Sequence, residues 1–264
     1  MECRIDDKII EYKITGEGDK WVTILQGWGT TYGLYDSIAG LLAPGYRVLQ
    51  FDLPGFGYSE EPEHPFSVSE YADWCLKLFS KLGISKTILI GHSYGGRIIL
   101  HLASRDRLPV EIEKLVFIDA AGVLPKRTKA QLRRQRRYKR LKRIAENPII
   151  YQMFPDLIDD WKSRQGSEDY RNASPLMKKA LVMAVNEDLC DKMPLIYQET
   201  LLIWGDKDTA TPLSDGETFN KLIPNSTLRV LEGTGHFSYA QRPAEFGQIL
   251  LEFLPVGRAK GGEL

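Results

Sequence analysis

The sequence predicts an α/β fold, in which a mostly parallel central sheet carries helices on both faces. Short apolar runs of strand type alternate along the chain with longer stretches whose apolar residues recur at helical spacing. Parallel strands are joined through helices and buried on both faces, so this alternation is typical of an α/β sheet. The chain has 264 residues, of which 43% are hydrophobic, enough for one such domain with a sizeable core.

The composition excludes several classes of protein. Lys+Arg and Asp+Glu both number 35, so the overall charge predicts no nucleic-acid or acidic partner. The three cysteines have no paired spacing, which argues against a disulfide scaffold or zinc site and favours a reducing compartment. The N-terminus lacks the apolar region of a signal peptide, and no apolar run could cross a bilayer. We therefore expect a cytoplasmic protein without stable membrane insertion.

The first part of the chain supplies three expected strands and two expected helices. The strands lie at 4–14, 21–25 and 46–51, and the helices at about 32–42 and 67–82. Ser67 and Glu70 form a capping-box pattern at the start of the second helix. Gly- and Pro-rich segments at 16–19 and 52–59 are expected to be turns or loops.

The central motif is Gly91-His92-Ser93-Tyr94-Gly95, which follows the apolar run 88–90 and precedes a helical pattern through 97–103. This G-x-S-x-G spacing is typical of a strained strand-to-helix turn, in which glycines let the backbones pack without Cβ clashes. Such a turn exposes the Ser93 hydroxyl at the carboxyl end of the strand. It also aims the Tyr94 amide at any oxyanion formed there.

After a strand at 114–118, the alternation stops and then resumes. Residues 123–196 contain helical stretches, such as 175–183, but no convincing strand. Further strands are expected at 200–204 and 227–231, with helices near 213–222 and 243–254. We therefore expect one core domain made of 1–122 and 197–264, a helical lid at 123–196, and a disordered tail from about 257.

A serine nucleophile needs a base, and the chain offers four histidines. His236 is the favoured base because it lies on a Gly-bracketed loop just after the strand at 227–231. His92 should point away from the nucleophile. His101 lies inside a helix, and His64 belongs to a Pro-rich loop, which favours ordinary packed or solvated roles.

The base needs an orienting acid, for which three aspartates are candidates. Asp208 follows the strand before that of His236 and is favoured because it gives the chain order Ser, Asp, His. Asp119 ends the strand after the serine helix and is a geometrically feasible alternative. Asp206 is better explained as a residue that caps or braces its turn.

A second oxyanion donor should come from the loop after an early strand. Gln26-Gly27-Trp28-Gly29 has the right place, and its glycines free the backbone to aim the Trp28 amide inward. The alternative is an ordinary Gly-rich strand-to-helix turn. With the lid residues Tyr151 and Phe154, Gln26 and Phe237 are the side chains that we expect to contact substrate.

Together these segments make the chain resemble the α/β-hydrolase superfamily, in its branch of lidded esterases, lipase-like enzymes and C–C bond hydrolases. Residues 91–96 resemble the family's nucleophile elbow, 26–29 its HGxG loop and 52–59 its D-x-P-G-x-G-x-S loop. Residues 205–208 and 235–237 resemble its acid and base segments. The resemblance covers about 5–254. It departs at Gln26, where the family usually has His, and Ser93 argues against the members that use an aspartate nucleophile.

The run at 126–143 is unusually rich in Lys and Arg. One interpretation is a patch for an anionic substrate, a membrane surface or nucleic acid. We favour a solvated lid helix that rests on Tyr138, Leu141 and Ile144 and is balanced by nearby carboxylates. Apolar residues between 149 and 161 would roof the pocket or pack the lid down, and a roof would suggest an apolar acyl or aromatic substrate.

The expected activity is hydrolysis of carboxylic esters or similar small acyl substrates by Ser93, His236 and Asp208, with no metal or organic cofactor. Cleavage of a C–C bond in a β-diketone-like substrate, or a lyase reaction, could use the same residues. An arginine facing Ser93, with Arg97 as one candidate, would favour that alternative. A slow-turnover receptor on the same fold, or a protein binding anionic surfaces through 126–143, would be non-enzymatic alternatives.

Overall fold

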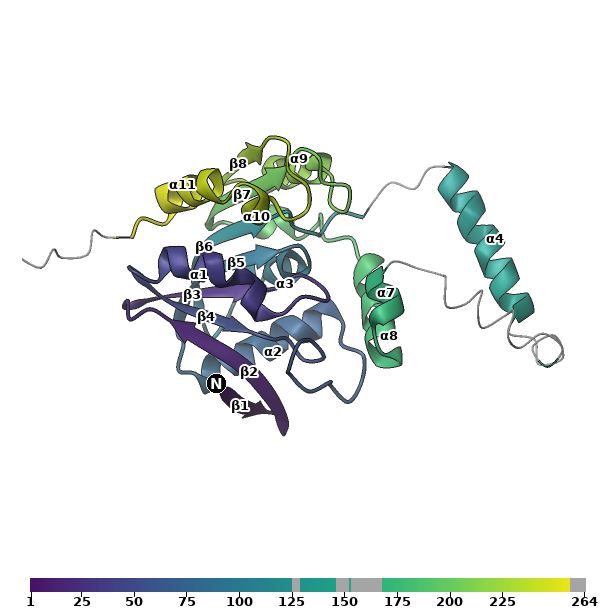
Figure 1. The fold of residues 1–264 in the computed structure, drawn as a ribbon, viewed down its shortest axis with the longest axis horizontal. Helices are drawn as coiled ribbons and strands as arrows, with labels where there is room; N and C mark the ends of the chain where they lie inside the picture. The colour runs from purple at the N-terminus through teal and green to yellow at the C-terminus, as the bar shows by residue number, and fades with distance from the viewer. Residues whose placement is uncertain (125–128, 146–151, 153–167, 257–264) are drawn as a thin grey trace, which may run out of the picture.

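The computed structural model describes residues 1–124, 129–145, 152 and 168–256. In this part of the chain, eight strands form one sheet in the order β1-β2-β4-β3-β5-β6-β7-β8 (Figure 1). The pairs β1–β2 and β2–β4 are antiparallel, and all the others are parallel, which confirms the predicted fold class. The strands are β1 Glu2–Ile5, β2 Lys8–Thr15, β3 Lys20–Leu25, β4 Tyr46–Phe51, β5 Lys86–His92, β6 Glu111–Ile118, β7 Glu199–Gly205 and β8 Ser226–Leu231.

Helices pack on both faces of the sheet because successive strand residues point into two different apolar cores. In β6, Val116 and Ile118 join one core, with α1 and α11, whereas Leu115 and Phe117 join the other, with α2, α3 and α9. The helices are η1 Tyr32–Tyr35, α1 Asp36–Leu42, α2 Val68–Lys81, α3 Tyr94–Ala103, α4 Lys129–Ala145, α7 Glu168–Asn172, α8 Pro175–Val185, η2 Met193–Leu195, α9 Leu213–Leu222, α10 Ser238–Gln241 and α11 Pro243–Phe253.

Two predicted elements differ from the structure. The strand expected at 4–14 is a hairpin, because Asp6 and Asp7 both have positive φ, at 49° and 61°, and reverse the chain between β1 and β2. The helix expected at 32–42 begins with the 3₁₀ turn η1 before α1. The capping box of α2 is present, since Ser67 and Glu70 each bond the other's backbone amide.

The segment between β6 and β7 contains α4, α7, α8 and η2, and α4 stands apart from the sheet (Figure 1). The predicted boundaries of the lid, and its closure over the site, stay predictions. The predicted tail at 257–264 lies outside the described residues. Among those described, no helix is both long and apolar enough to span a bilayer.

Candidate active site

Ser93 lies between β5 and α3 in a conformation that serine rarely adopts, with a φ of 49°. The end of β6 and the chain after it hold this turn, because the Ser93 amide donates to the Ile118 carbonyl at 3.1 Å and the Ser93 carbonyl accepts from the Ala121 amide at 2.9 Å. These bonds offset the strain of the turn and fix the hydroxyl at the carboxyl end of β5.

The glycines of the motif are required by close packing around this turn. A Cβ on Gly91 would lie 2.6 Å from a methyl carbon of Ile99, and one on Gly95 would lie 2.2 Å from the Leu25 carbonyl oxygen. Real Cβ atoms do not approach so closely, so only glycine lets α3 begin directly against β3 and β5.

The structure brings together Ser93, His236 and Asp208 from three separate segments. His236 Nε2 lies 2.9 Å from Ser93 Oγ, and His236 Nδ1 lies 2.8 Å from Asp208 Oδ2. Since an ionised carboxylate only accepts hydrogen bonds, Nδ1 carries the proton and Nε2 is free to accept from the Ser93 hydroxyl. The unprotonated nitrogen therefore faces the serine.

Asp208 is held in its ionised form by several hydrogen bonds. Its carboxylate accepts from the amides of Ala210 and Thr211, at 2.7 and 3.0 Å, and from the Thr211 hydroxyl at 2.7 Å. Burial raises the pKa of this carboxyl, but the bonds from His236 and Thr211 outweigh burial, and the net pKa is below its ordinary value. The ionised carboxylate therefore accepts the hydrogen bond from His236 Nδ1.

The other two candidate aspartates bond to backbone and not to His236. Asp119 accepts from the Gly205 amide at 2.9 Å and from the amide and hydroxyl of Ser238 at 3.0 and 2.7 Å. Asp206 accepts from the Gly233 amide and so links the turn after β7 to the loop after β8. Asp119 therefore ties the ends of β6 and β7 to α10, and the carboxylate beside the His236 ring is that of Asp208.

The loop at 26–29 lies beside the elbow. The Trp28 ring makes edge contacts with Phe56 and Tyr94, at centroid distances of 4.9 and 5.1 Å. Within the described residues, no hydrogen bond uses the Trp28 or Tyr94 amide, so both stay available to a ligand. The Gln26 side chain is only 1% exposed and donates to the Thr30 carbonyl, so it braces its own loop; its contact with substrate stays a prediction.

A buried hydrogen-bond chain that the sequence did not reveal joins this loop to the His236 loop. The Gly27 amide donates to the Tyr35 hydroxyl at 2.8 Å, which lies 3.0 Å from His92 Nδ1. His92 Nε2 lies 2.8 Å from the carbonyl of His236 and must donate to it. Nδ1 of a neutral His92 is then the acceptor from Tyr35.

His92 stays neutral in this chain. Burial is the largest effect and lowers its pKa from 6.5 to about 3. Its two ring nitrogens bond Tyr35 and the His236 carbonyl, and neither bonds Ser93. His92 holds the His236 backbone through the hydrogen bond to the His236 carbonyl. The centroid of its ring also lies 5.2 Å from that of Phe237.

The loop at 52–59 is built around the carboxylate of Asp52. Its oxygens accept from the amides of Tyr32 and Tyr58, at 2.7 and 3.0 Å, and the Ser59 hydroxyl donates to the Asp52 carbonyl at 2.7 Å. Gly57 has a φ of 52°, and a Cβ there would collide with this carboxylate. The motif residues thus fix the loop that carries Phe56 under Trp28.

A cavity of about 400 Å³ opens beside Trp28, between this loop and the α7–α8 junction. Its lining combines apolar and polar side chains: Trp28, Phe56, Met177, Glu61, Asn172 and Ser174. Phe237, which is 39% exposed, lies next to His236, whereas Tyr151 and Phe154 lie outside the described residues. Their substrate contacts stay predictions.

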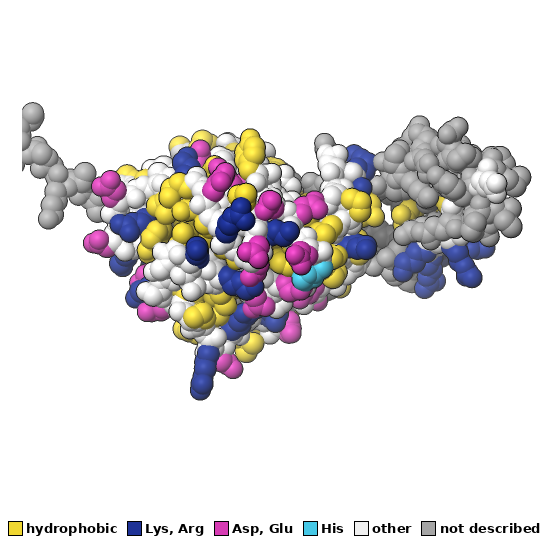
Figure 2. All heavy atoms as spheres, turned by 90° about the horizontal axis from the view of Figure 1, so that it is seen from below, with side chains coloured by type: hydrophobic (Ala, Val, Ile, Leu, Met, Phe, Trp, Pro, Cys, Tyr) yellow, Lys and Arg dark blue, Asp and Glu magenta, His cyan; other side chains and the backbone are white. Residues whose placement is uncertain are grey.

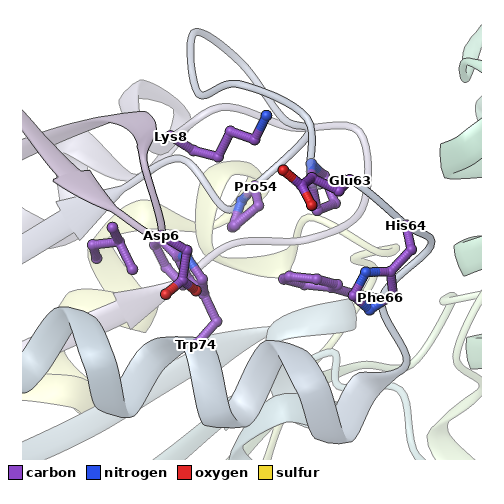
Figure 3. Close-up of a pocket in the computed structure, with 9 residues that line it drawn as sticks. Asp6, Lys8, Pro54, Glu63, His64, Phe66 and Trp74 are labelled. Carbon is purple, nitrogen blue, oxygen red and sulfur yellow. The ribbon is translucent and has the colours of Figure 1, made fainter.

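A second hollow, of about 230 Å³, lies between the β1–β2 hairpin and the start of α2 and includes Asp6, His64, Phe66 and Trp74 (Figure 3). It shares no residue with the Ser93 arrangement. His64 bonds Glu70 at its rim, and His101 is buried against Glu187. In the part of the chain that the structure describes, no three His, Cys, Asp or Glu side chains cluster as a metal site would require.

The eight-stranded sheet and the serine on its strand-to-helix turn are features of the α/β-hydrolase class. A family model described as "alpha/beta hydrolase fold" matches residues 20–243. The chain therefore belongs to the α/β-hydrolase family.

Proteins similar to this chain have varied names. A Pseudomonas putida protein named 2-hydroxy-6-oxononadienedioate/2-hydroxy-6-oxononatrienedioate hydrolase 2 is 27% identical, over 94% of this chain and 92% of its own. The bromoperoxidase structure from Bacillus anthracis has a TM-score of 0.73 at 26% identity, covering 94% of this chain and 95% of its own. An Exiguobacterium antarcticum esterase has a TM-score of 0.72 at 22% identity, covering 95% and 97%, and shows the shared fold alone.

Proposed function

We propose that this protein is a serine hydrolase of carboxylic esters or similar small acyl substrates. The observation that carries the proposal is the continuous arrangement Ser93 Oγ–His236 Nε2 and His236 Nδ1–Asp208, with distances of 2.9 and 2.8 Å. A serine hydroxyl becomes an effective nucleophile when a neighbouring imidazole can take its proton and an acid holds that imidazole in the correct tautomer.

In the acylation step, Ser93 Oγ attacks the ester carbonyl while its proton moves to His236 Nε2. The carbonyl oxygen becomes an oxyanion, which the Trp28 and Tyr94 amides would bind; one such donor is worth about 3–4 kcal/mol in the transition state. Asp208 balances the positive imidazolium. The tetrahedral intermediate collapses when His236 returns the proton to the leaving alcohol, and an acyl-Ser93 ester remains.

In the deacylation step, His236 takes a proton from water, and the resulting hydroxide attacks the acyl-enzyme. The same two amides would hold the second oxyanion, and the proton returns from His236 to Ser93 Oγ as the carboxylic acid leaves. No step needs a redox partner. The cavity beside Trp28 would receive part of the substrate, and residues 123–196 would form the lid over it.

The test is labelling with a fluorophosphonate probe, read by intact mass. We expect one covalent adduct on the parent protein, none on Ser93→Ala and strongly slowed labelling on His236→Ala. Labelling that persists in Ser93→Ala would refute the assignment. A panel of p-nitrophenyl esters of increasing acyl length then measures turnover; labelling without turnover would indicate a receptor on the same fold.

Hydrolysis of a C–C bond is the second candidate, because the Pseudomonas putida relative is named as a hydrolase of an oxo-dienedioate. Arg97 was the candidate from the sequence for binding a substrate carboxylate. Its side chain is 5% exposed and donates to the Glu187 carbonyl at 2.9 Å. That engagement favours the ester reaction. Release of a carboxylic acid from a β-diketone-like substrate at a rate exceeding that of every ester in the panel would reverse the order of the two candidates.

A further inference from the structure

Helix α4 has a composition unlike any other element described. Of its 17 residues, nine are Lys or Arg and none is Asp or Glu. The full chain, by contrast, balances 35 basic with 35 acidic residues. The positive charge of α4 is therefore a local feature, concentrated on one helix.

Five arginines of α4 lie on one side of the helix, at the spacing i, i+3, i+4, i+7 and i+10. We call this set the arginine stripe: Arg133, Arg136, Arg137, Arg140 and Arg143. It spans about 15 Å along the axis, at 1.5 Å per residue. This spacing usually carries the apolar residues by which a helix packs on its protein. Here all five positions are arginine and all are exposed, so this side is not made for packing against the core.

Among the described residues, the arginine stripe has no bonding partner. In the described ranges, no ion pair or hydrogen bond joins any of the five guanidinium groups to another residue. Four of them, with Leu141, line a groove of about 400 Å³. Lys and Arg side chains gather at the end of the molecule where α4 stands apart from the sheet (Figures 1 and 2).

We propose that the arginine stripe docks this protein on an anionic phospholipid surface. The planar guanidinium group pairs with phosphate oxygens through two parallel hydrogen bonds, so a row of five suits a phosphate-bearing layer. A row on one side of a straight, projecting helix can meet a flat surface along its whole length. The attachment is peripheral and electrostatic, and it is independent of Ser93 chemistry.

Leu141 favours a lipid surface over nucleic acid. The expectation that the helix rests on Leu141 is wrong, because this side chain is 41% exposed. It lies in the groove with four stripe arginines, where it can enter the apolar boundary below the head groups. Sequence-tolerant binding of single-stranded nucleic acid relies on stacked aromatic rings. Tyr138, the aromatic residue of α4, lies about 100° around the helix from Arg137, the nearest stripe arginine, whereas Leu141 lies about 40° from it at 100° per residue.

The test is flotation of the full chain with vesicles at about 50 mM NaCl. One set contains phosphatidylcholine alone and the other a mixture with phosphatidylglycerol. We expect binding only to the anionic vesicles, loss of binding near 0.5 M NaCl, and at least a tenfold weaker affinity when all five stripe arginines are changed to Gln. A matched control removes the same charge from exposed basic residues elsewhere: Arg4, Lys20, Arg107, Lys221 and Arg229. It should bind like the parent.

Three results would overturn the proposal: no flotation of the parent with anionic vesicles, equal binding by the stripe variant, or an equal loss in the matched control. Displacement by single-stranded RNA at equal phosphate concentration, with tighter binding of that RNA, would assign the stripe to nucleic acid instead. The thermal midpoint of the stripe variant should equal that of the parent because the changed side chains are exposed. If the thermal midpoint differs, the double variant Arg137→Gln with Arg140→Gln replaces the fivefold variant in the flotation test. We expect it to lose an intermediate part of the affinity for anionic vesicles.

Discussion

Replacing His92 by glutamine should remove much of the acid sensitivity of this fold. His92 is buried at the centre of the chain Gly27–Tyr35–His92–His236, where burial lowers its pKa from 6.5 to about 3. In the unfolded chain, the imidazole titrates near the ordinary value. At a pH between these two pKa values, His92 is protonated in the unfolded state and neutral in the folded state.

The size of the effect follows from this difference. Above about pH 6.5, His92 is neutral in both states, so its titration does not change the free energy of unfolding. As the pH falls from 6.5 toward 3, the free energy of unfolding decreases by about 1.4 kcal/mol per pH unit, or about 5 kcal/mol across the window. Between pH 6.5 and 4.5 the loss is about 2.7 kcal/mol, a large part of a typical stability of about 5–15 kcal/mol.

Glutamine keeps a donor for the His236 carbonyl and an acceptor for Tyr35 but cannot titrate. The assay is urea unfolding, followed by tryptophan fluorescence, at several values from pH 7.5 to 4.5. The stability difference between parent and His92→Gln should shift steadily in favour of the variant below pH 6.5. His101, which is present in both proteins, cancels in this difference.

The matched control is His64→Gln, which changes an exposed histidine paired with Glu70 and leaves buried His92 in place. It should keep the loss of stability that His92 causes below pH 6.5. Parallel curves for the parent and His92→Gln between pH 6.5 and 4.5 would refute the reasoning, because they would mean that folded His92 accepts a proton.

Three further predictions concern the site and its frame. Asp208→Asn should lower kcat on a p-nitrophenyl ester about 10⁴-fold, because an amide would stabilise the wrong tautomer of the base; Asp119→Asn should mainly lower the thermal midpoint, and the opposite ranking would move the acid role to Asp119. Tyr35→Phe leaves two buried polar groups unpaired and should cost about 2–6 kcal/mol in urea unfolding, at about 1–3 for each; a loss below about 0.5 kcal/mol would contradict the buried chain. Gly95→Ala places a Cβ 2.2 Å from a carbonyl oxygen of β3 and should prevent stable folding, whereas Gly40→Ala, with nothing within 4 Å in α1, should stabilise by about 0.5–1 kcal/mol.

The alternation of strands and helices could be predicted from the sequence because both faces of the sheet are buried. Each central strand is then apolar along its length, as in Leu115–Ile118, and stands out from the helical periods between strands. The hairpin at Asp6-Asp7 was missed because its two left-handed residues are both Asp, without the glycine that usually marks such a turn.

The serine and the histidine of the candidate site were predictable because each lies in a short motif with its own local signal. The choice among aspartates was harder: Asp119 and Asp208 follow adjacent strands, and spacing alone does not say which carboxylate turns toward His236. The structure separates them through their backbone donors, since Asp119 is occupied by Gly205 and Ser238.

The support of His236 by His92 could not be predicted, because the two residues are 144 positions apart and the bond joins a side chain to a backbone carbonyl. The residue type at position 236 does not indicate that its backbone carbonyl accepts a hydrogen bond from a distant side chain. The sequence indicated only that His92 would turn away from the nucleophile. Long-range bonds of this kind depend on the way β5 and the loop after β8 meet in space, which no local pattern records.

The hydrogen-bond chain from Gly27 to His236 also has a consequence for the order in which the site is assembled during synthesis. The loop beside the elbow is synthesised early, whereas His236, the base of the proposed mechanism, follows β7 and β8 in the chain. A nascent chain that ends at β7 would therefore contain Ser93 without the histidine that bonds it. If Ser93 and His236 act as proposed, hydrolysis of a p-nitrophenyl ester requires the segment that follows β7, and proteolytic removal of the chain from β8 onward should abolish it.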